Sequence, residues 1–171
     1  MLEMVLGGAR SGKSAFAERL AEASGRAVTY IATARPEDEE MRERIDHHRR
    51  GRRPEWAVVE EPLALAEVML AHAADDRCLL VDCLTVWLSN LLAVEPRLPT
   101  ECSALLELLP ALPGHVILVS NEVGWGLVPM HPVGRRFRDE AGRLNQQVAA
   151  LCERVTLVAA GLPLVLKGAP N

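Results

Sequence analysis

The amino-acid sequence predicts an α/β protein built on a mostly parallel sheet with helices on both faces. Two observations carry this prediction. Short apolar runs alternate with helical patterns along the 171 residues, which is the order expected of βαβ units. The apolar runs also lack polar alternation, as strands do when both of their faces are buried. The length suggests a single domain spanning 1–171, and a hydrophobic content of 49% suffices for a core.

Six strands are predicted from short runs of aliphatic and β-branched residues. The clearest are Cys-Leu-Leu-Val-Asp at 78–82 and His-Val-Ile-Leu-Val-Ser at 115–120. The predicted strands span 2–6, 27–31, 56–60, 78–82, 115–120 and 154–160. Ligands of such sheets bind at the carboxyl ends of the strands, so the residues that follow each run are the candidates for function.

Helices are predicted between these strands from the 3.6-residue spacing of apolar positions. The predicted helices span 13–24, 37–50, 62–73, 84–93, 100–110 and 133–152. Residues 94–114 overlap one of them but contain Pro96, Pro99, Pro110 and Pro113. This segment is therefore expected to be a solvated excursion without a functional role.

The loop between the first strand and the first helix carries the strongest motif. Residues 7–14 read Gly-Gly-Ala-Arg-Ser-Gly-Lys-Ser and fit the phosphate-binding pattern G-x-x-x-x-G-K-[ST]. Its glycines let the backbone curl so that N–H groups point at an anion, and the following helix adds its positive N-terminal end. Lys13 is expected to reach the β- and γ-phosphates, and the Ser14 hydroxyl to hold Mg²⁺. The sheet is therefore predicted to be of the P-loop NTPase, RecA-like type.

The use of lysine supports this interpretation of the loop. Of the 19 basic residues, only Lys13 and Lys167 are lysines. A chain that otherwise uses arginine thus places a lysine where a compact ammonium, rather than a planar fork, suits phosphate oxygens.

Charge and cysteine content argue against several classes of protein. The net charge of −4 is unlike that of a general nucleic-acid binder. The four cysteines form no C-x-x-C pair and no zinc spacing, and Cys78 and Cys83 are expected to be buried beside an apolar run. Neither a signal peptide nor a membrane span of about 20 apolar residues is expected. A cytoplasmic protein in a reducing compartment is predicted.

An acidic residue at the end of a buried strand suggests a second part of the nucleotide site. Asp82 ends the run 78–82, which is the Walker B arrangement that helps hold Mg²⁺. Glu122 is a rival for this role because it follows the apolar run 116–119.

The predicted helix 37–50 contains two adjacent histidines. Acidic residues lead and basic residues trail, as the helix dipole favours. Met41, Ile45 and His48 share one face, whereas His47 lies off it. His48 is therefore the candidate for packing and His47 the candidate for reactivity. One interpretation is a solvated, charged helix with a basic end; the other is a nucleophilic histidine beside a phosphate-binding arginine cluster. That cluster would comprise Arg49, Arg50, Arg52 and Arg53.

A third segment, Asn-Glu-Val-Gly-Trp-Gly at 121–126, follows a predicted strand and should lie at the ligand edge of the sheet. Its two glycines imply special backbone angles or close approach to a ligand. An ordinary glycine-rich turn is the alternative.

Together these segments resemble the bifunctional adenosylcobinamide kinase / adenosylcobinamide-phosphate guanylyltransferase family of cobalamin biosynthesis. The phosphate-binding loop is shared by many enzymes, whereas the His-His segment and the Asn-Glu-Val-Gly loop are much more specific. Residues 94–114 match little of the family, and Trp125 has no assigned role. The matching stretches are 7–14, 30–33, 40–41, 44–48, Glu60, 82–85, 89–92, 121–124, 128–129, 137–139, 142–143 and 145–146.

The resemblance implies two reactions. The first phosphorylates the aminopropanol hydroxyl of adenosylcobinamide with a nucleoside triphosphate, ATP or GTP. The second transfers GMP from GTP to that phosphate, giving adenosylcobinamide-GDP and pyrophosphate. The guanylylated histidine of the family falls on His47, and Lys13 is the second expected catalytic residue. The substrates are small molecules, and the family suggests a homo-oligomer, with a trimer as the expected form.

The resemblance also implies which residues bind the nucleotide and its Mg²⁺. The metal ligands are expected to be Ser14 and Asp82. The nucleotide contacts fall on Gly7, Gly8, Ala9, Arg10, Ser11, Gly12, Lys13, Ser14, Ala32, Thr33, Ala34, His48, Arg49, Arg50, Gly51, Glu60 and Asp82.

Two other functions compete with this one. A P-loop small-molecule kinase would use Lys13, Ser14 and Asp82 but no histidine nucleophile, and would release no pyrophosphate. A nucleotide-dependent regulatory module would bind and slowly hydrolyse nucleotide without a corrinoid substrate. Function must be argued from the site rather than from the fold. His47 separates the bifunctional enzyme from the plain kinase, and turnover of a corrinoid substrate separates both from the regulatory module.

Overall fold

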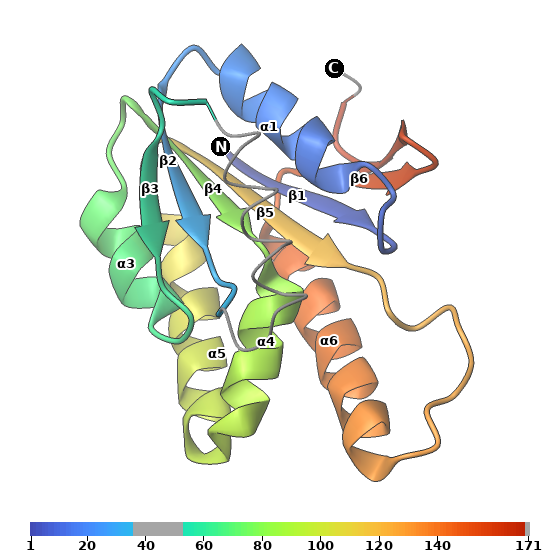
Figure 1. The fold of residues 1–171 in the computed structure, drawn as a ribbon. Helices are drawn as coiled ribbons and strands as arrows, with labels where there is room; N and C mark the ends of the chain where they lie inside the picture. Colours follow the sequence, from blue (N-terminus) through green and yellow to red (C-terminus); the bar gives the residue numbers. More distant parts are fainter. Residues whose placement is uncertain (36–52, 170–171) are drawn as a thin grey trace.

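A seven-stranded sheet forms the centre of the computed structural model, which describes residues 1–35 and 53–169 (Figure 1). The strand order is β3-β2-β4-β5-β1-β6-β7. The first six strands in the sequence are parallel, and the last pairs antiparallel with β6. The strands are β1 (Leu2–Gly7), β2 (Ala27–Ala32), β3 (Ala57–Glu60), β4 (Arg77–Asp82), β5 (His115–Asn121), β6 (Arg154–Ala159) and β7 (Leu162–Lys167). The predicted α/β class and mostly parallel sheet are confirmed.

The six predicted strands all form, but strand β7 was not predicted from the sequence. It is an edge strand that carries Pro163, and most of its side chains are exposed, so it lacks the apolar, buried signature of the others. Strands β6 and β7 form a hairpin. Ala160 and Gly161 join them with φ of 51° and 79°, the two positive angles of a tight two-residue turn.

The helices lie on both faces of the sheet, as predicted, but unequally. Helix α1 (Lys13–Ala23) covers one face (Figure 1). The other described helices, α3 (Leu65–His72), α4 (Leu84–Ala93), α5 (Leu98–Leu108) and α6 (Pro132–Leu151), cover the opposite face. The predicted helix 37–50 lies outside the described residues.

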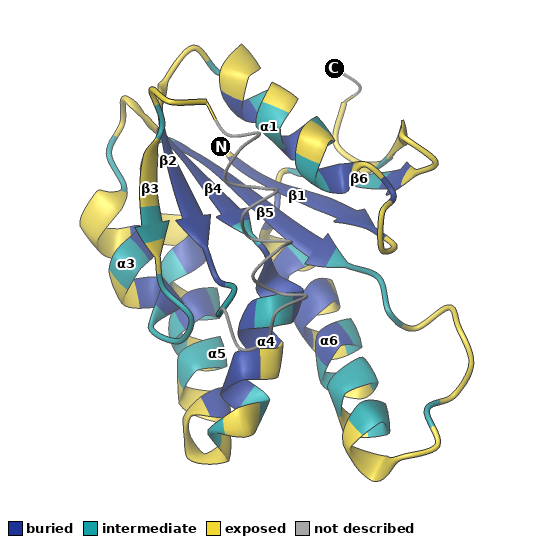
Figure 2. Ribbon diagram, in the orientation of Figure 1, coloured by how far each residue is buried: buried dark blue, intermediate teal, exposed yellow. Residues whose placement is uncertain are grey.

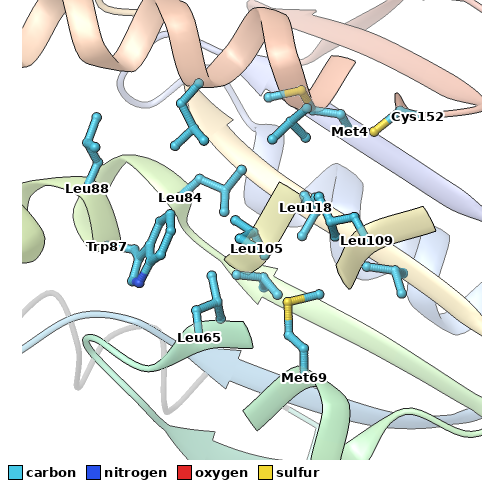
Figure 3. Packing of buried hydrophobic residues seen from close by; sticks show 14 of the residues in the cluster. Met4, Leu65, Met69, Leu84, Trp87, Leu88, Leu105, Leu109, Leu118 and Cys152 are labelled. Carbon is cyan, nitrogen blue, oxygen red and sulfur yellow. The ribbon is translucent and has the colours of Figure 1, made fainter. Parts of the chain in front are cut away.

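Large apolar side chains fill the space between the sheet and the four-helix face. Trp87, Leu84 and Leu88 of α4 meet Leu105 of α5 and Leu118 of β5 (Figure 3). The indole Nε1–H of Trp87 donates to the Leu63 carbonyl at 2.8 Å, so this buried ring keeps a polar partner. On the other face, Ala17 and Ala21 of α1 are fully buried, and their small size lets the helix lie close to the sheet.

The expectation that residues 94–114 form a solvated excursion is wrong. The segment folds as a short 3₁₀ helix (Glu95–Arg97), helix α5 and a second 3₁₀ helix (Leu109–Ala111). Leu98, Leu105 and Leu109 are buried in the main core. Pro96, Pro99 and Pro110 stand in the first turns of these helices, where a missing N–H costs nothing, so they start helices rather than mark a loop. Pro113 follows the last of these helices and leads into β5.

All four cysteines are free thiols, and Cys78 and Cys83 are buried as predicted. Burial is the main reason that the pKa of each thiol is raised: to about 11 for Cys78, Cys83 and Cys102, and to about 12 for Cys152. They stay protonated near neutral pH, and the protonated thiol is a poor nucleophile.

Within 1–35 and 53–169, no helix has both the length and the apolar character needed to span a membrane.

Candidate functional site

Most of the predicted site residues lie along one edge of the sheet, where the parallel strands end. Strand β1 ends at Gly7, β2 at Ala32, β3 at Glu60 and β4 at Asp82. Between β1 and β4 lies β5, which ends at Asn121. This is the edge at which open α/β sheets bind ligands.

The phosphate-binding loop has the backbone geometry that its glycines predict. Gly12, with φ of 94°, precedes α1, and Arg10 also has a positive φ of 56°. A Cβ on Gly7 would collide with Ser11 Oγ and with the Val158 carbonyl. The Ser11 N–H donates to the Gly8 carbonyl at 3.3 Å and closes the turn. The loop therefore curls tightly over the end of β1, and a side chain at Gly7 would open it.

Lys13 lies across this loop. Its Nζ donates to the Gly8 carbonyl at 3.3 Å, and the residue is 9% exposed. Helix α1 begins here without a side-chain cap and without an acidic residue in its first turn. Its first amide groups and the positive end of its dipole thus face outward toward an anion site.

Two segments distant in sequence hold the loop in place. The Gly161 N–H in the β6–β7 turn donates to the Ser11 carbonyl at 2.8 Å. On the other side, the Glu122 N–H donates to the Gly7 carbonyl at 3.1 Å. A Cβ on Gly12 would lie 3.2 Å from the Cα of Gly161, so the two glycines pack closely. This role of Gly161 was not predicted from the sequence. The loop is therefore held in shape before any ligand arrives.

Ser11 adds an unpaired polar atom to the loop. Its Oγ is buried and has no hydrogen-bond partner within the described part of the chain. Buried hydroxyls are normally paired, so this one is available to a ligand oxygen.

Asp82 is held at the end of β4 by a hydrogen bond from the Tyr30 hydroxyl to its Oδ2, at 2.9 Å. The neighbouring Cys83 thiol is affected by both Asp82 and Lys13 of the phosphate-binding loop. Burial raises the pKa of Cys83, the Asp82 carboxylate raises it further, and the Lys13 ammonium acts in the opposite sense. Asp82 and Lys13 thus both lie within electrostatic reach of one thiol, across the intervening strand β5.

The rival acid, Glu122, is turned back on its own loop. Its Oε1 accepts the Gly124 N–H at 2.6 Å. Asp82 and Glu122 are both partly exposed, so burial does not decide between them. Each acid accepts one hydrogen bond, Asp82 from the neighbouring strand β2 and Glu122 from its own loop, and Asp82 stays the predicted metal-binding acid.

Thr33 joins the ends of β2 and β4. Its hydroxyl donates to the Cys83 carbonyl at 2.8 Å and accepts the Cys83 N–H at 2.9 Å. The Asn90 side chain of α4 donates to the Thr33 carbonyl at 2.8 Å. Since Thr33 is fully buried and Ala32 nearly so, the accessible residue of the predicted segment 32–34 is Ala34.

Glu60 is not beside the phosphate-binding loop. It ends the edge strand β3, which lies four strands away from β1. At about 4.8 Å per strand, the separation is about 19 Å. A nucleotide with its phosphates on the loop could meet Glu60 only with its far end.

Five of the predicted residues, His47, His48, Arg49, Arg50 and Gly51, lie outside the described residues. The next arginine of the predicted cluster that is described, Arg53, is engaged elsewhere. Its Nε lies 2.6 Å from Glu22 Oε1 of α1, and this hydrogen-bonded ion pair raises the pKa of Arg53.

A ring of hydrogen bonds that sequence reasoning missed lies behind the site. The Asn121 N–H donates to Thr85 Oγ1 at 2.6 Å, and Ser120 Oγ donates to Asn145 Oδ1 at 2.7 Å. Thr85 and Ser120 hydroxyls lie 3.1 Å apart; since Ser120 gives its proton to Asn145, Thr85 must donate to Ser120. Asn145 Nδ2 closes the ring on the Asn121 carbonyl at 3.2 Å. The ring fixes the end of β5 against α4 and α6.

The oxygen donors at this edge suit Mg²⁺. No group of three or more His, Cys, Asp or Glu side chains gathers as a metal site in the described ranges. The Ser14 hydroxyl and Asp82 carboxylate are hard oxygen ligands, of the kind that bind Mg²⁺ together with substrate phosphates and water. The predicted ligands thus fit the ion.

A family model described as cobinamide kinase / cobinamide phosphate guanyltransferase matches residues 3–166. The chain is 57% identical over 172 residues to the bifunctional adenosylcobalamin biosynthesis protein CobP of Pseudomonas aeruginosa, covering 99% of both chains. It is 40% identical over 182 residues to the bifunctional adenosylcobalamin biosynthesis protein CobU of Escherichia coli, covering 98% of this chain and 100% of that one. The Salmonella typhimurium protein of the same name is 38% identical with the same coverage.

Among solved structures, the crystal structure of the RadB recombinase is similar, with a TM-score of 0.46 and 18% sequence identity. The similarity covers 91% of this chain and 73% of that one.

Proposed function

Because the chain belongs to the cobinamide kinase / cobinamide phosphate guanyltransferase family, we propose that its single phosphate-binding loop serves both reactions. The protein is a bifunctional enzyme of cobalamin biosynthesis. The proposal concerns which residues do the work. Its main support is the loop 7–14, held in shape by Glu122 and Gly161 beside Asp82.

In the kinase reaction, the loop binds the triphosphate of ATP or GTP. The α1 amide groups and the Lys13 ammonium offset the charge of the β- and γ-phosphates, and Ser11 Oγ supplies a further contact. Ser14 and Asp82 hold Mg²⁺, which neutralises charge on the phosphate oxygens when bound. The Tyr30 hydroxyl orients the Asp82 carboxylate through its 2.9 Å hydrogen bond. The acceptor is the aminopropanol hydroxyl of adenosylcobinamide.

In the transferase reaction, His47 is the nucleophile. Its neutral imidazole attacks the α-phosphorus of GTP; a P–N bond forms, the P–O bond to pyrophosphate breaks, and the imidazole proton passes to solvent. A phosphate oxygen of adenosylcobinamide phosphate then attacks the same phosphorus, the P–N bond breaks, and the imidazole takes a proton back from solvent. Arg49 and Arg50 offset the charge of the α-phosphate, and His48, Gly51, Ala32–Ala34 and Glu60 complete the nucleotide contacts.

Incubation with α-labelled GTP tests the transferase proposal. The wild-type protein should take up label in a bond that is stable in base and labile in acid, as a phosphoramidate is. Uptake should fall as the pH drops through the histidine range near ~6.5, because only the neutral imidazole attacks. His47→Ala should lose both the adduct and GMP transfer yet keep kinase activity, since direct phosphoryl transfer needs no histidine nucleophile.

His48→Ala is the matched control. It should still form the adduct, with weaker nucleotide binding or lower stability. Acid-labile GMP-protein formed by His47→Ala at the wild-type rate would refute the assignment. Kinase activity without any pyrophosphate release would support the plain kinase, and nucleotide hydrolysis without corrinoid turnover the regulatory module.

Two further expectations stay predictions. A homo-oligomer, in trimeric form, can be tested by sedimentation equilibrium of the purified chain. A cytoplasmic location is supported by four cysteines that are all free thiols, and can be tested by cell fractionation.

A further inference from the structure

An exposed apolar loop leaves the carboxyl end of β5. It runs from Val123 to His131 and continues into Pro132 and Val133, the first two residues of α6; the segment 123–133 is called the apolar loop below. Figure 1 shows it swinging away from the sheet before α6 begins, and Figure 2 shows most of it exposed. Its large apolar side chains are Trp125, Leu127, Val128, Met130 and Val133, with exposed fractions of 78%, 97%, 64%, 91% and 74%. Exposed apolar side chains gathered in one segment mark a binding surface more often than an accident of folding.

The apolar loop is held at both ends. At its start, the Glu122 N–H donates to the Gly7 carbonyl, and Glu122 Oε1 accepts the Gly124 N–H. At its end, the Arg135 guanidinium donates to the carbonyls of Pro129 and Met130 at 3.1 and 2.7 Å. A Cβ on Gly134 would lie 2.9 Å from Pro129 Cβ, so the chain packs closely there. The fold thus positions this apolar surface.

The composition of the apolar loop indicates what it binds. Residues 123–134 contain no Asp, Glu, Lys or Arg, in a chain that is 25% charged. The one titratable side chain of this segment is His131, so the surface offers little charge with which to recognise phosphates. It suits a large ligand with apolar faces and uncharged polar groups at its rim.

The position of the apolar loop adds a second constraint. The hydrogen bond from Glu122 to Gly7 places its start against the first residue of the phosphate-binding loop. The acceptor hydroxyl must lie within about 3–3.5 Å of the γ-phosphorus for phosphoryl transfer. The rest of the acceptor molecule therefore has to lie near the phosphate-binding loop, where the apolar loop begins. A corrinoid has the required chemistry: a flat macrocycle with apolar faces and amide groups at its rim.

We infer that the apolar loop is the corrinoid platform of the enzyme, with Trp125 and Met130 packing against the macrocycle. This inference rests on the proposed function and assigns a role to Trp125, which the family resemblance left without one. The platform fixes the macrocycle so that its aminopropanol arm reaches the phosphates on the neighbouring loop. The platform therefore contributes to the affinity for the corrinoid and not to the affinity for the nucleotide.

Steady-state kinetics of the full chain test the platform. Trp125→Ala should raise the KM for adenosylcobinamide at least about tenfold, the size of effect typical of a dominant aromatic contact. Its KM for the nucleotide and its rate of GMP uptake from GTP, which needs no corrinoid, should match the wild type. Trp125→Phe should restore most of the corrinoid affinity because it keeps a flat apolar ring. Leu70→Ala is the control, since Leu70 is 63% exposed on α3, away from this loop.

Fluorescence gives a readout that is independent of turnover. Corrinoids absorb strongly, so bound adenosylcobinamide should quench Trp125 more than the other two tryptophans, Trp56 before β3 and Trp87 in the core, which lie farther from the apolar loop. The largest part of the quenching should be lost in Trp125→Phe even though that variant still binds.

Three results would overturn the inference. The KM for adenosylcobinamide could be unchanged in both Trp125→Ala and Met130→Ala. The nucleotide KM could rise in parallel with the corrinoid KM. Substitution could instead change the sedimentation of the protein, which would identify the loop as a contact between copies of the chain. If the wild-type protein itself neither phosphorylates adenosylcobinamide nor takes up GMP, the proposed function fails instead.

Discussion

At the scale of single residues, the two lysines of the chain show how position decides the role of a side chain. Lys13 lies over the phosphate-binding loop, with its Nζ on the Gly8 carbonyl. Lys167, at the end of β7, donates to the carbonyls of Ala149 and Ala150 at 3.0 and 2.8 Å. The latter contacts satisfy carbonyl groups in the last turn of α6. The same ammonium group is therefore placed for ligand charge in one case and for helix capping in the other.

Lys13→Ala should lower kcat/KM of the kinase and transferase reactions together, by about 10²–10³-fold, the typical loss for one pre-organised electrostatic donor. Both reactions fall because both need the triphosphate bound on one loop. Steady-state assays with a circular dichroism spectrum to verify folding make the measurement. Lys167→Ala is the matched control and should keep near-normal turnover. Normal rates for Lys13→Ala in both assays would remove the loop from the mechanism.

Asp82→Asn should raise the Mg²⁺ concentration for half-maximal activity at least about tenfold. The amide oxygen can still accept the hydrogen bond from Tyr30, so the fold should persist while the metal loses a charged ligand. Activity measured across a Mg²⁺ titration tests this. Glu122→Gln should leave the Mg²⁺ dependence unchanged; the reverse pattern would show that Glu122 is the metal-binding acid.

At the scale of elements, the site depends on contacts between segments that are remote in sequence. The β6–β7 turn supports the phosphate-binding loop through Gly161, and the end of β5 joins it through Glu122. Behind them, the ring of Asn121, Thr85, Ser120 and Asn145 fixes β5 against α4 and α6. Each member of this ring both satisfies and depends on its neighbours, so the ring behaves as one unit.

Asn145→Ala should lower the free energy of unfolding by about 2–4 kcal/mol, because it leaves the buried Ser120 hydroxyl and the Asn121 carbonyl without their partner. Urea denaturation gives the measurement. The neighbouring Gln146 is exposed on the same helix, and Gln146→Ala should change stability by less than about 0.5 kcal/mol. Equal stabilities of the two variants would mean that the ring contributes nothing.

At the scale of the whole molecule, the two edges of the sheet have different tasks. The carboxyl edge carries the phosphate-binding loop, Asp82 and the apolar loop. The amino edge carries a buried polar cluster, in which Glu3 Oε1 lies 2.9 Å from His115 Nε2 and Glu3 Oε2 lies 3.6 Å from Arg154. Glu3 is only 3% exposed and His115 8%. This cluster links β1, β5 and β6 at the edge remote from the chemistry, so it serves stability.

Glu3→Ala should lower the free energy of unfolding by about 3–5 kcal/mol, since it removes the buried carboxylate that His115 and Arg154 both contact. The KM for nucleotide should stay unchanged, because β1 separates Glu3 from the loop by about 13 Å. Thermal or urea unfolding, together with kinase assays, tests both parts. Glu153→Ala removes an exposed acid near the same edge and should have the smaller effect on stability; a changed nucleotide KM in Glu3→Ala would show that the two edges are coupled.

The sequence by itself determined the fold class, six of the seven strands, and the loop 7–14. These are local features: strand and helix signals depend on the spacing of apolar residues within a few turns, and a phosphate-binding loop depends on glycines at set positions. Asp82 was found in the same way, because it ends a buried run.

The tertiary structure decided what depends on non-local contacts. It placed Gly161 against Gly12, and it bonded the Thr33 hydroxyl to the backbone of Cys83 at the end of β4. It also placed Glu60 four strands from β1. It turned the proline-containing segment 94–114 into part of the core and left the apolar loop exposed beside Gly7. None of this follows from periodicity, because the strand order β3-β2-β4-β5-β1-β6-β7 brings together segments far apart in the chain, and a side chain's role depends on the neighbours that this order provides.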